Sequence, residues 1–119
     1  MMKRIYIMMV LVSCLACEDI LPDQDISNDT VVLIAPSNDA VLNITTINFS
    51  WEAVQDADHY HLQIAQPSFQ AALQIIQDTI ITSNQFSTSL SANSYEWRVR
   101  GENGAYQTNY TTQNFSVEE

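Results

Sequence analysis

Hydrophobic and polar residues alternate along three stretches of the chain. The three stretches are residues 47–51, 59–64 and 95–100. Because successive side chains of a β-strand point to opposite faces, a period of two predicts strands with one buried face and one wet face. Phe115 and Val117 repeat the pattern near the C-terminus, and residues 31–34, which are followed by Pro36, predict a first strand at a sheet edge.

The segment between the second and third stretches is less regular. Residues 67–73 are compatible with a helical turn, whereas the β-branched residues 75–82 favour a strand and residues 86–90 favour another. Seven short strands are then separated by turn signals. Seven strands in about 88 residues with no cysteine pair predict an all-β fold, a seven-stranded antiparallel Greek-key sandwich of two packed sheets.

The length and the net charge of the chain exclude some classes of function. The chain has 119 residues, which is room for one domain. It has 14 acidic residues and four basic ones, and two of the basic ones, Lys3 and Arg4, lie at its start. Arg98 and Arg100 are therefore the cations of the remaining chain. A surface with this balance repels polyanions, which argues against nucleic acid as a partner and against direct docking on anionic lipid.

The first 17 residues are typical of an export signal. Lys3 and Arg4 form a basic end, residues 5–12 are apolar, and small residues precede a cysteine. A helix that crosses a bilayer needs about 20 apolar residues, so this run is too short for a transmembrane span. Cys14 and Cys17 both lie in this segment, so no disulfide is expected in the mature domain.

Those cysteines carry a resemblance to bacterial lipoboxes, in which small residues precede a cysteine that becomes the lipidated first residue. The two matching stretches are Leu11-Val12-Ser13-Cys14 and Leu15-Ala16-Cys17. Glu18 and Asp19 follow Cys17 directly, as in lipoproteins of Bacteroidetes-type bacteria. We therefore expect a signal peptide over residues 1–16 and lipidation of Cys17, with Cys14 as the alternative. A cleaved signal that releases a soluble protein is the competing interpretation.

Residues 17–30 are acidic, contain a proline and show no sustained period, so they predict a tether. A tether of this length spans about 20 Å as a coil and up to about 40 Å when extended. The predicted domain then covers residues 31–119.

Three stretches of that domain resemble strands B, C and F of fibronectin type III domains. They are Phe49-Ser50-Trp51, residues 57–62 and residues 90–103. Tyr95, five residues after Leu90, matches the tyrosine corner, and Trp97 stands where an immunoglobulin domain has its second cysteine. Residues 67–78 are longer than a minimal connection in this family, and the Arg-Gly-Asp tripeptide is absent. The resemblance implies a non-enzymatic module and carries over no receptor-binding motif.

The strand pattern also predicts which side chains form the core. Tyr95, Val99, Trp51 and Tyr60 should enclose Trp97 between the sheets, because alternate residues of a strand share one face. The residues between them should point to water.

Four residues of the opposite face form a candidate interaction surface: His59, His61, Arg98 and Arg100. His59 and His61 lie two apart on one predicted strand, on the same face and about 7 Å apart. If the two strands are neighbours, as in the family, this is where positive charge gathers in the mature chain. The competing interpretation is cross-strand pairing of Arg98 or Arg100 with nearby carboxylates.

The sequence gives little support for catalysis, a metal or a cofactor. His59 and His61 could share a metal, but no third ligand has matching spacing. Asp56 and Asp58 lie in a predicted loop without the Asp-x-Asp-x-Asp-Gly pattern of calcium loops. No nucleophile, base and oxyanion donor come together in the predicted fold. We therefore expect no enzyme activity and no cofactor.

Together these features predict a lipoprotein held at the outer membrane of the cell envelope by an acyl anchor, with a protein or glycan partner. Phe49-Ser50-Trp51 and residues 60–64 are also similar to N-terminal modules of outer-membrane starch-binding lipoproteins, so a glycan-binding accessory protein of a polysaccharide-uptake system is the alternative. Tyr106 and Tyr110 are candidates for stacking on sugar rings. Residues 29–31 and 78–80 resemble a short O-glycosylation motif of Bacteroidetes-type bacteria.

Overall fold

The computed structural model describes residues 22–71 and 74–119. The predicted leader, with Cys14 and Cys17, lies outside these residues. Eight strands are present in the described part: β1 Leu33–Ala35, β2 Ala40–Leu42, β3 Thr46–Trp51, β4 His59–Gln66, β5 Gln74–Ile81, β6 Gln85–Ser89, β7 Asn93–Glu102 and β8 Thr111–Val117. No helix in residues 22–71 or 74–119 is long and apolar enough to cross a membrane.

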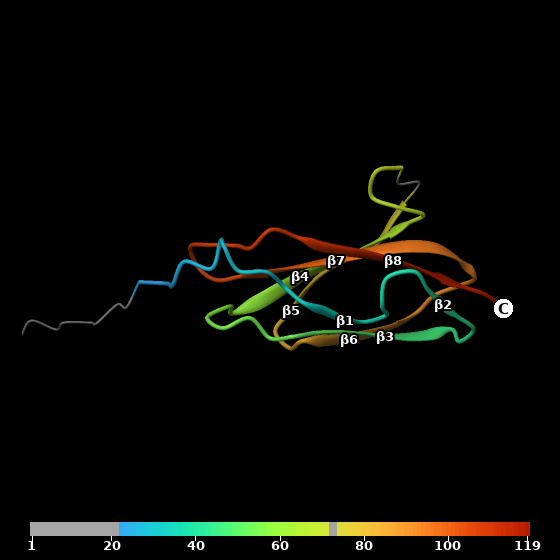
Figure 1. Cartoon of the computed structure of the whole chain (residues 1–119), viewed down its shortest axis with the longest axis horizontal. Helices are drawn as coiled ribbons and strands as arrows, with labels where there is room; N and C mark the ends of the chain where they lie inside the picture. Colours follow the sequence, from blue (N-terminus) through green and yellow to red (C-terminus); the bar gives the residue numbers. More distant parts are fainter. Residues whose placement is uncertain (1–21, 72–73) are drawn as a thin grey trace, which may run out of the picture.

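The strands form two packed sheets, which are seen as two layers in Figure 1. One sheet has the order β1-β3-β6, and the other has the order β2-β8-β7-β4-β5. The all-β sandwich predicted from the sequence is therefore confirmed. The strand that the sequence pattern missed is β2, a three-residue segment that pairs in parallel with β8. Three residues are too few to show a period of two.

The alternation of buried and exposed residues sets the register of β4 and β7. Leu62 pairs with Val99 and His61 pairs with Arg100, so apolar residues meet apolar residues and polar residues meet polar ones. A slip of one residue would exchange the two faces and place Arg100 in the core. The two arginines therefore share the outer face of the sheet with the two histidines.

The core lies between the sheets and is rich in aromatic rings. Trp97 and Trp51 are fully buried, and their ring centres are 6.4 Å apart. Phe49 lies 4.9 Å from Trp97 in an edge-on arrangement, and Tyr60 packs on Trp51 at 5.5 Å. The enclosure of Trp97 predicted from the sequence is confirmed.

The tyrosine corner is also present. The Tyr95 hydroxyl donates a hydrogen bond of 2.6 Å to the carbonyl oxygen of Ser91, across the turn that precedes β7. Leu90, at the start of that turn, is 9% exposed. The bond fixes the turn against the buried Tyr95 ring, as the resemblance to the tyrosine corner implied.

Part of the predicted tether packs on the sandwich. Ile26 is 1% exposed, and the carbonyl oxygen of Gln24 accepts a 2.8 Å hydrogen bond from the side-chain amide of Asn103. The same amide donates to the carbonyl oxygen of Asp56 at 3.1 Å. The folded part of the chain therefore extends upstream of residue 31. The sequence pattern did not predict this, because Ile26 is a single buried residue outside any alternating stretch.

Candidate functional site

The outer face of the five-stranded sheet gathers the four residues of the candidate interaction surface. His59 and His61 lie on β4, and Arg98 and Arg100 lie opposite them on β7. The register pairs His61 with Arg100 and His59 with Glu102. The structure thus brings these side chains together as the sequence suggested, and it adds groups that the sequence did not place there.

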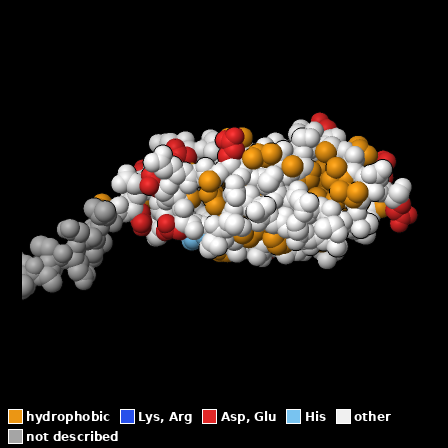
Figure 2. All heavy atoms as spheres, turned by 90° about the horizontal axis from the view of Figure 1, so that it is seen from below, with side chains coloured by type: hydrophobic (Ala, Val, Ile, Leu, Met, Phe, Trp, Pro, Cys, Tyr) orange, Lys and Arg blue, Asp and Glu red, His pale blue; other side chains and the backbone are white. Residues whose placement is uncertain are grey.

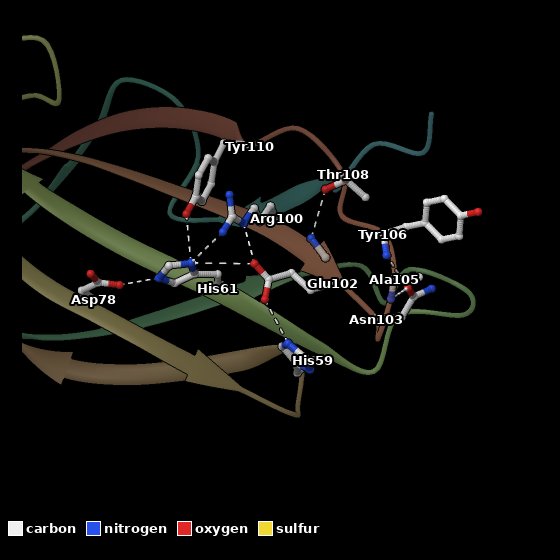
Figure 3. Close-up of polar contacts among 11 residues, drawn as sticks. His59, His61, Asp78, Arg100, Glu102, Asn103, Ala105, Tyr106, Thr108 and Tyr110 are labelled. Carbon is white, nitrogen blue, oxygen red and sulfur yellow. Dashed lines mark hydrogen bonds and ion pairs between the residues drawn. The ribbon is translucent and has the colours of Figure 1, made fainter. Parts of the chain in front are cut away.

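Glu102 is the anionic centre of this surface (Figure 3). One carboxylate oxygen lies 2.9 Å from Nε2 of His59, and the other accepts a 2.6 Å hydrogen bond from Nε of Arg100. The side chain of Glu102 is 14% exposed. A mostly covered carboxylate that is bonded to two side chains is held in one orientation more firmly than the carboxylate of a fully exposed ion pair.

His61 is contacted from three other elements. Its Nε2 forms a short contact with the carboxylate of Asp78 on β5. Its Nδ1 lies 3.0 Å from the Tyr110 hydroxyl and 3.4 Å from Nη2 of Arg100 (Figure 3). Both ring nitrogens are therefore occupied by protein groups, so the imidazole is part of a network.

Arg98 is held by aromatic rings. Its guanidinium carbon lies 4.0 Å from the centre of the Phe69 ring and 4.3 Å from that of Tyr110, and its Nε donates to Gln63 at 2.8 Å. The guanidinium of Arg100 also lies over Tyr110, at 4.7 Å. Cross-strand pairing with carboxylates was the simpler expectation for Arg98 or Arg100, whereas the carboxylate that Arg100 contacts is Glu102, two positions along the same strand. Arg98 differs because two rings cover its planar charged group.

Phe69 and Tyr110 were not predicted as members of this surface. Phe69 belongs to the irregular segment before β5, and its backbone N–H donates to the carboxylate of Glu96 at 2.9 Å, which fastens the segment over the sheet. Tyr110 precedes β8. Neither residue lies in an alternating stretch that would assign it to a face of the sheet. The sequence therefore showed only that aromatic residues occur in these two segments.

Three groups of this surface, Glu102, Asp78 and Tyr110, have shifted pKa values. Burial raises the pKa of the Glu102 carboxyl, but the bonds from Arg100 and His59 outweigh it and the net pKa is lowered. The hydrogen bond from His61 lowers the pKa of Asp78. Burial raises the pKa of Tyr110 against the opposing effect of the two arginines. The surface therefore stabilises both carboxylates in their charged form.

This network predicts a loss of stability in acid. Because the folded-state pKa of Glu102 is lowered, its stabilising effect is complete above the unfolded glutamate pKa of about 4.3 and is lost as the pH falls through the folded-state value. Glu102→Gln should lower the free energy of unfolding by about 1 kcal/mol at pH 7, since a charged acceptor becomes a neutral one. The deficit should shrink as the pH falls below about 4.3 and through the lowered folded-state pKa of Glu102.

Urea denaturation at several pH values measures this effect. Glu52→Gln is the matched control, because Glu52 is exposed. A deficit for Glu102→Gln that stays constant down to pH 3, or an equal deficit for Glu52→Gln, would show that the Glu102 network does not stabilise the fold.

The remaining candidates are separated by the structure. Tyr106 is 39% exposed in the turn before β8, whereas the Tyr110 ring points toward His61, so the two rings do not form one platform (Figure 3). Thr30 is exposed, and Thr79 lies on β5 opposite the buried Leu62. Within residues 22–71 and 74–119, no three His, Cys, Asp or Glu side chains are grouped to hold a metal ion.

The described residues form shallow, open depressions on the surface. A shallow open depression of about 330 Å³ lies near the ends of β7 and β8, with Asp39, Ser68 and Glu96 among its lining residues. Two further depressions have volumes of about 290 and 220 Å³, and the second of them is formed by the turn at 102–107. These shapes suit contact with a macromolecular surface better than enclosure of a small molecule.

Comparison with known proteins supports the fold alone. No protein-family model and no curated protein sequence matches the chain. Among solved structures, fibronectin(III)-like modules of CbhA from Clostridium thermocellum align with a TM-score of 0.55 and 11% identity, covering 75% of this chain and 96% of theirs.

Two further structures give the same result. The protein FN3tt aligns with a TM-score of 0.53 and 14% identity over 74% of this chain and 95% of its own. A fibronectin type III domain from the human KIAA0970 protein aligns with a TM-score of 0.55 and 12% identity over 74% of this chain and 72% of its own. The strand order, the tyrosine corner and these alignments together show that the chain has a fibronectin type III-like fold.

Proposed function

We propose that the protein is a non-enzymatic lipoprotein of the bacterial cell envelope, anchored to the outer membrane through acyl chains on Cys17, whose fibronectin type III-like sandwich is an interaction or assembly module. The observation that carries the module role is the candidate interaction surface, where His61, Arg98 and Arg100 are gathered with Tyr110 on one sheet face. Domains of this fold generally serve as binding or linking modules.

The composition of that surface supports a role in binding. Arg and Tyr are enriched at the centres of protein interfaces, because a planar cation and a rigid amphipathic ring offer large contact area at a small cost in conformational entropy. Here Arg98 and Arg100 are already held by rings and by Glu102. A partner would therefore meet side chains that need little further ordering.

The anchor is supported by the lipobox-like sequence that ends at Cys17. One acyl chain binds a bilayer marginally and reversibly, whereas two or more give stable residence. A multiply acylated cysteine followed by the acidic residues 18–30 would hold the sandwich near the membrane surface, and the negative charge would keep it from lying flat on anionic lipid. The acidic start is similar to that of surface-exported lipoproteins.

Metabolic labelling tests the anchor. In a bacterial host, a fatty-acid analogue should label the wild-type chain, and Cys17→Ala should abolish labelling while Cys14→Ala retains it. Labelling that survives Cys17→Ala and is lost in Cys14→Ala moves the anchor to Cys14. An unlabelled wild-type chain would refute the lipoprotein proposal.

A further inference from the structure

The outermost strand of the larger sheet, β5, is an open edge. It spans eight residues and pairs only with β4 in the described sheet. A register shift interrupts the pairing between Ile64 and Ala65, and the regular stretch of β5 runs from residue 77 to residue 81. An edge of this kind presents backbone N–H and C=O groups to another chain.

The other sheet edges are shorter. β1 and β2 have three residues each, and β1 is followed by Pro36, while β6 has five residues. Proteins protect edges with short strands, proline and charged side chains, lysine above all. The eight residues of β5 include no Pro, Lys or Arg, Asp78 is their one charged residue, and β5 is the longest edge of the described sandwich.

The side chains of β5 that share the outer face are exposed. Ile80 is 59% exposed, and the side chain of Asp78 is 56% exposed. Both lie opposite outer-face residues of β4, since Ile80 pairs with His61 and Asp78 with Gln63. An apolar and an acidic side chain thus stand two positions apart beside an unpaired backbone.

The direction of the β5 backbone groups follows from the alternation of an antiparallel sheet. In β7, the outer-face residue Glu102 accepts from the N–H of Asp58, on the β4 side, and the inner-face residue Gly101 accepts from Thr108, on the β8 side. Outer-face residues of β7 therefore bond toward β4, and their partners in β4 bond back toward β7.

By the same alternation, the inner-face residues of β4 bond toward β5. Leu62 is such a residue, and its partner is Thr79, so the N–H and C=O of Thr79 are used within the sheet. The N–H and C=O of Asp78 and Ile80 then point to the free edge. The exposed side chains and the free backbone groups of β5 belong to the same two residues.

We infer that β5 accepts an additional strand from another protein, and that this strand carries a basic residue facing Asp78 and an apolar residue facing Ile80, two positions apart. The inference rests on the proposed role as an interaction module and is independent of the acyl anchor. Backbone bonds to an edge give affinity in this mode, and alternate side chains give specificity.

Charge selects a basic strand over a second copy of the chain. Twelve of the 14 acidic residues lie in residues 22–119, where Arg98 and Arg100 are the cations. Figure 2, the view from below Figure 1, shows the face of β3 and β6, where carboxylates and hydrophobic groups are visible and Lys and Arg are not. Two copies with this net negative charge repel each other, whereas a cationic segment is drawn toward Asp78.

A synthetic strand provides the probe. The capped peptide Thr-Val-Thr-Ile-Thr-Lys-Thr-Val-Thr, aligned antiparallel to β5, can place Ile against Ile80 and Lys against Asp78. NMR of the full chain should show slowed amide exchange at Asp78 and Ile80 on binding, with little change at Thr79. The same peptide with Glu in place of Lys should bind at least about tenfold more weakly, since like charges side by side on a sheet repel.

Three variants separate the contribution of the β5 backbone to peptide binding from that of its side chains. Ile80→Pro removes an edge N–H without removing a bond to β4 and should weaken binding of the Lys peptide about tenfold or more, whereas Ile80→Val should change it less than about threefold. Asp78→Asn should erase the preference for Lys over Glu, and it keeps the test open if Ile80→Pro fails to fold.

Three results would overturn the inference: no binding of the Lys peptide at millimolar concentration, protection centred on Arg98 and Tyr110 in place of β5, or dimerisation of the chain in sedimentation that Ile80→Pro abolishes. The fatty-acid labelling experiment is unaffected by each of these results. A failure at β5 is therefore distinguishable from a failure of the anchor.

Discussion

Trp97→Ala should lower the free energy of unfolding by about 3–5 kcal/mol, because it removes a large ring from the core and leaves a cavity between the sheets. Trp97 is fully buried and contacts Phe49 and Trp51. The loss is a large part of the 5–15 kcal/mol typical of a whole domain, and no cysteine follows residue 17 to supply a disulfide. Equilibrium urea denaturation, followed by tryptophan fluorescence and circular dichroism, measures the loss.

Two controls make this result specific. Trp97→Phe retains most of the ring and removes an indole N–H that has no acceptor among the described residues, so it should cost much less than Trp97→Ala. Arg98→Ala, one residue away on the opposite face, should cost about 1–2 kcal/mol, since it removes one hydrogen bond and two partly exposed cation–π contacts. A loss at Arg98 equal to that at Trp97 would mean that the faces of β7 are inverted.

The core could be predicted because its residues lie in strictly alternating strands. In β3, in β7 and in residues 59–64 of β4, each apolar residue is separated from the next by one polar residue, so the buried face follows from the sequence alone. Tyr95 added the position of a turn, since its spacing from Leu90 matches a known corner. The sandwich could therefore be predicted from the alternation of apolar and polar residues within each strand.

The outer face was only partly predictable, for a physical reason. The alternation placed His61 and Arg100 on one face, and pairing of β4 with β7 brought them together. Phe69 and Tyr110 come from irregular segments, whose course depends on single contacts such as the bond from Phe69 to Glu96. Sequence periodicity carries no information on such contacts, so the aromatic cover of Arg98 required the structure.

For the edge strand β5, the sequence pattern predicted the strand but not its place in the sheet. Its β-branched residues predicted a strand, and the observed bounds, Gln74–Ile81, agree with residues 75–82 to within one position. The sequence could not say that the strand lies at an edge, because edge position depends on the order of strands in the sheet. The combination of Ile80, Asp78 and free backbone becomes visible only with that order.

Phe49, on β3, is a second core ring whose removal should be costly, because its ring packs against rings from three other strands. Its ring lies 4.9 Å from Trp97 on β7, 5.7 Å from Phe115 on β8 and 6.3 Å from Phe86 on β6. Phe49→Ala should therefore cost about 3–5 kcal/mol, as expected for a fully buried ring.

The double variant of Phe49 and Trp97 tests whether the two rings act as a unit. Because they are in direct edge-on contact, the double variant should lose less than the sum of the two single losses, by about 0.5–1.5 kcal/mol. Phe49→Leu is the matched control, since it keeps most of the buried volume and should cost clearly less than alanine. Urea denaturation of the four members of the cycle gives the coupling. Strict additivity would show that Phe49 and Trp97 fill separate parts of the core and that the edge-on contact adds nothing to the stability of the sandwich.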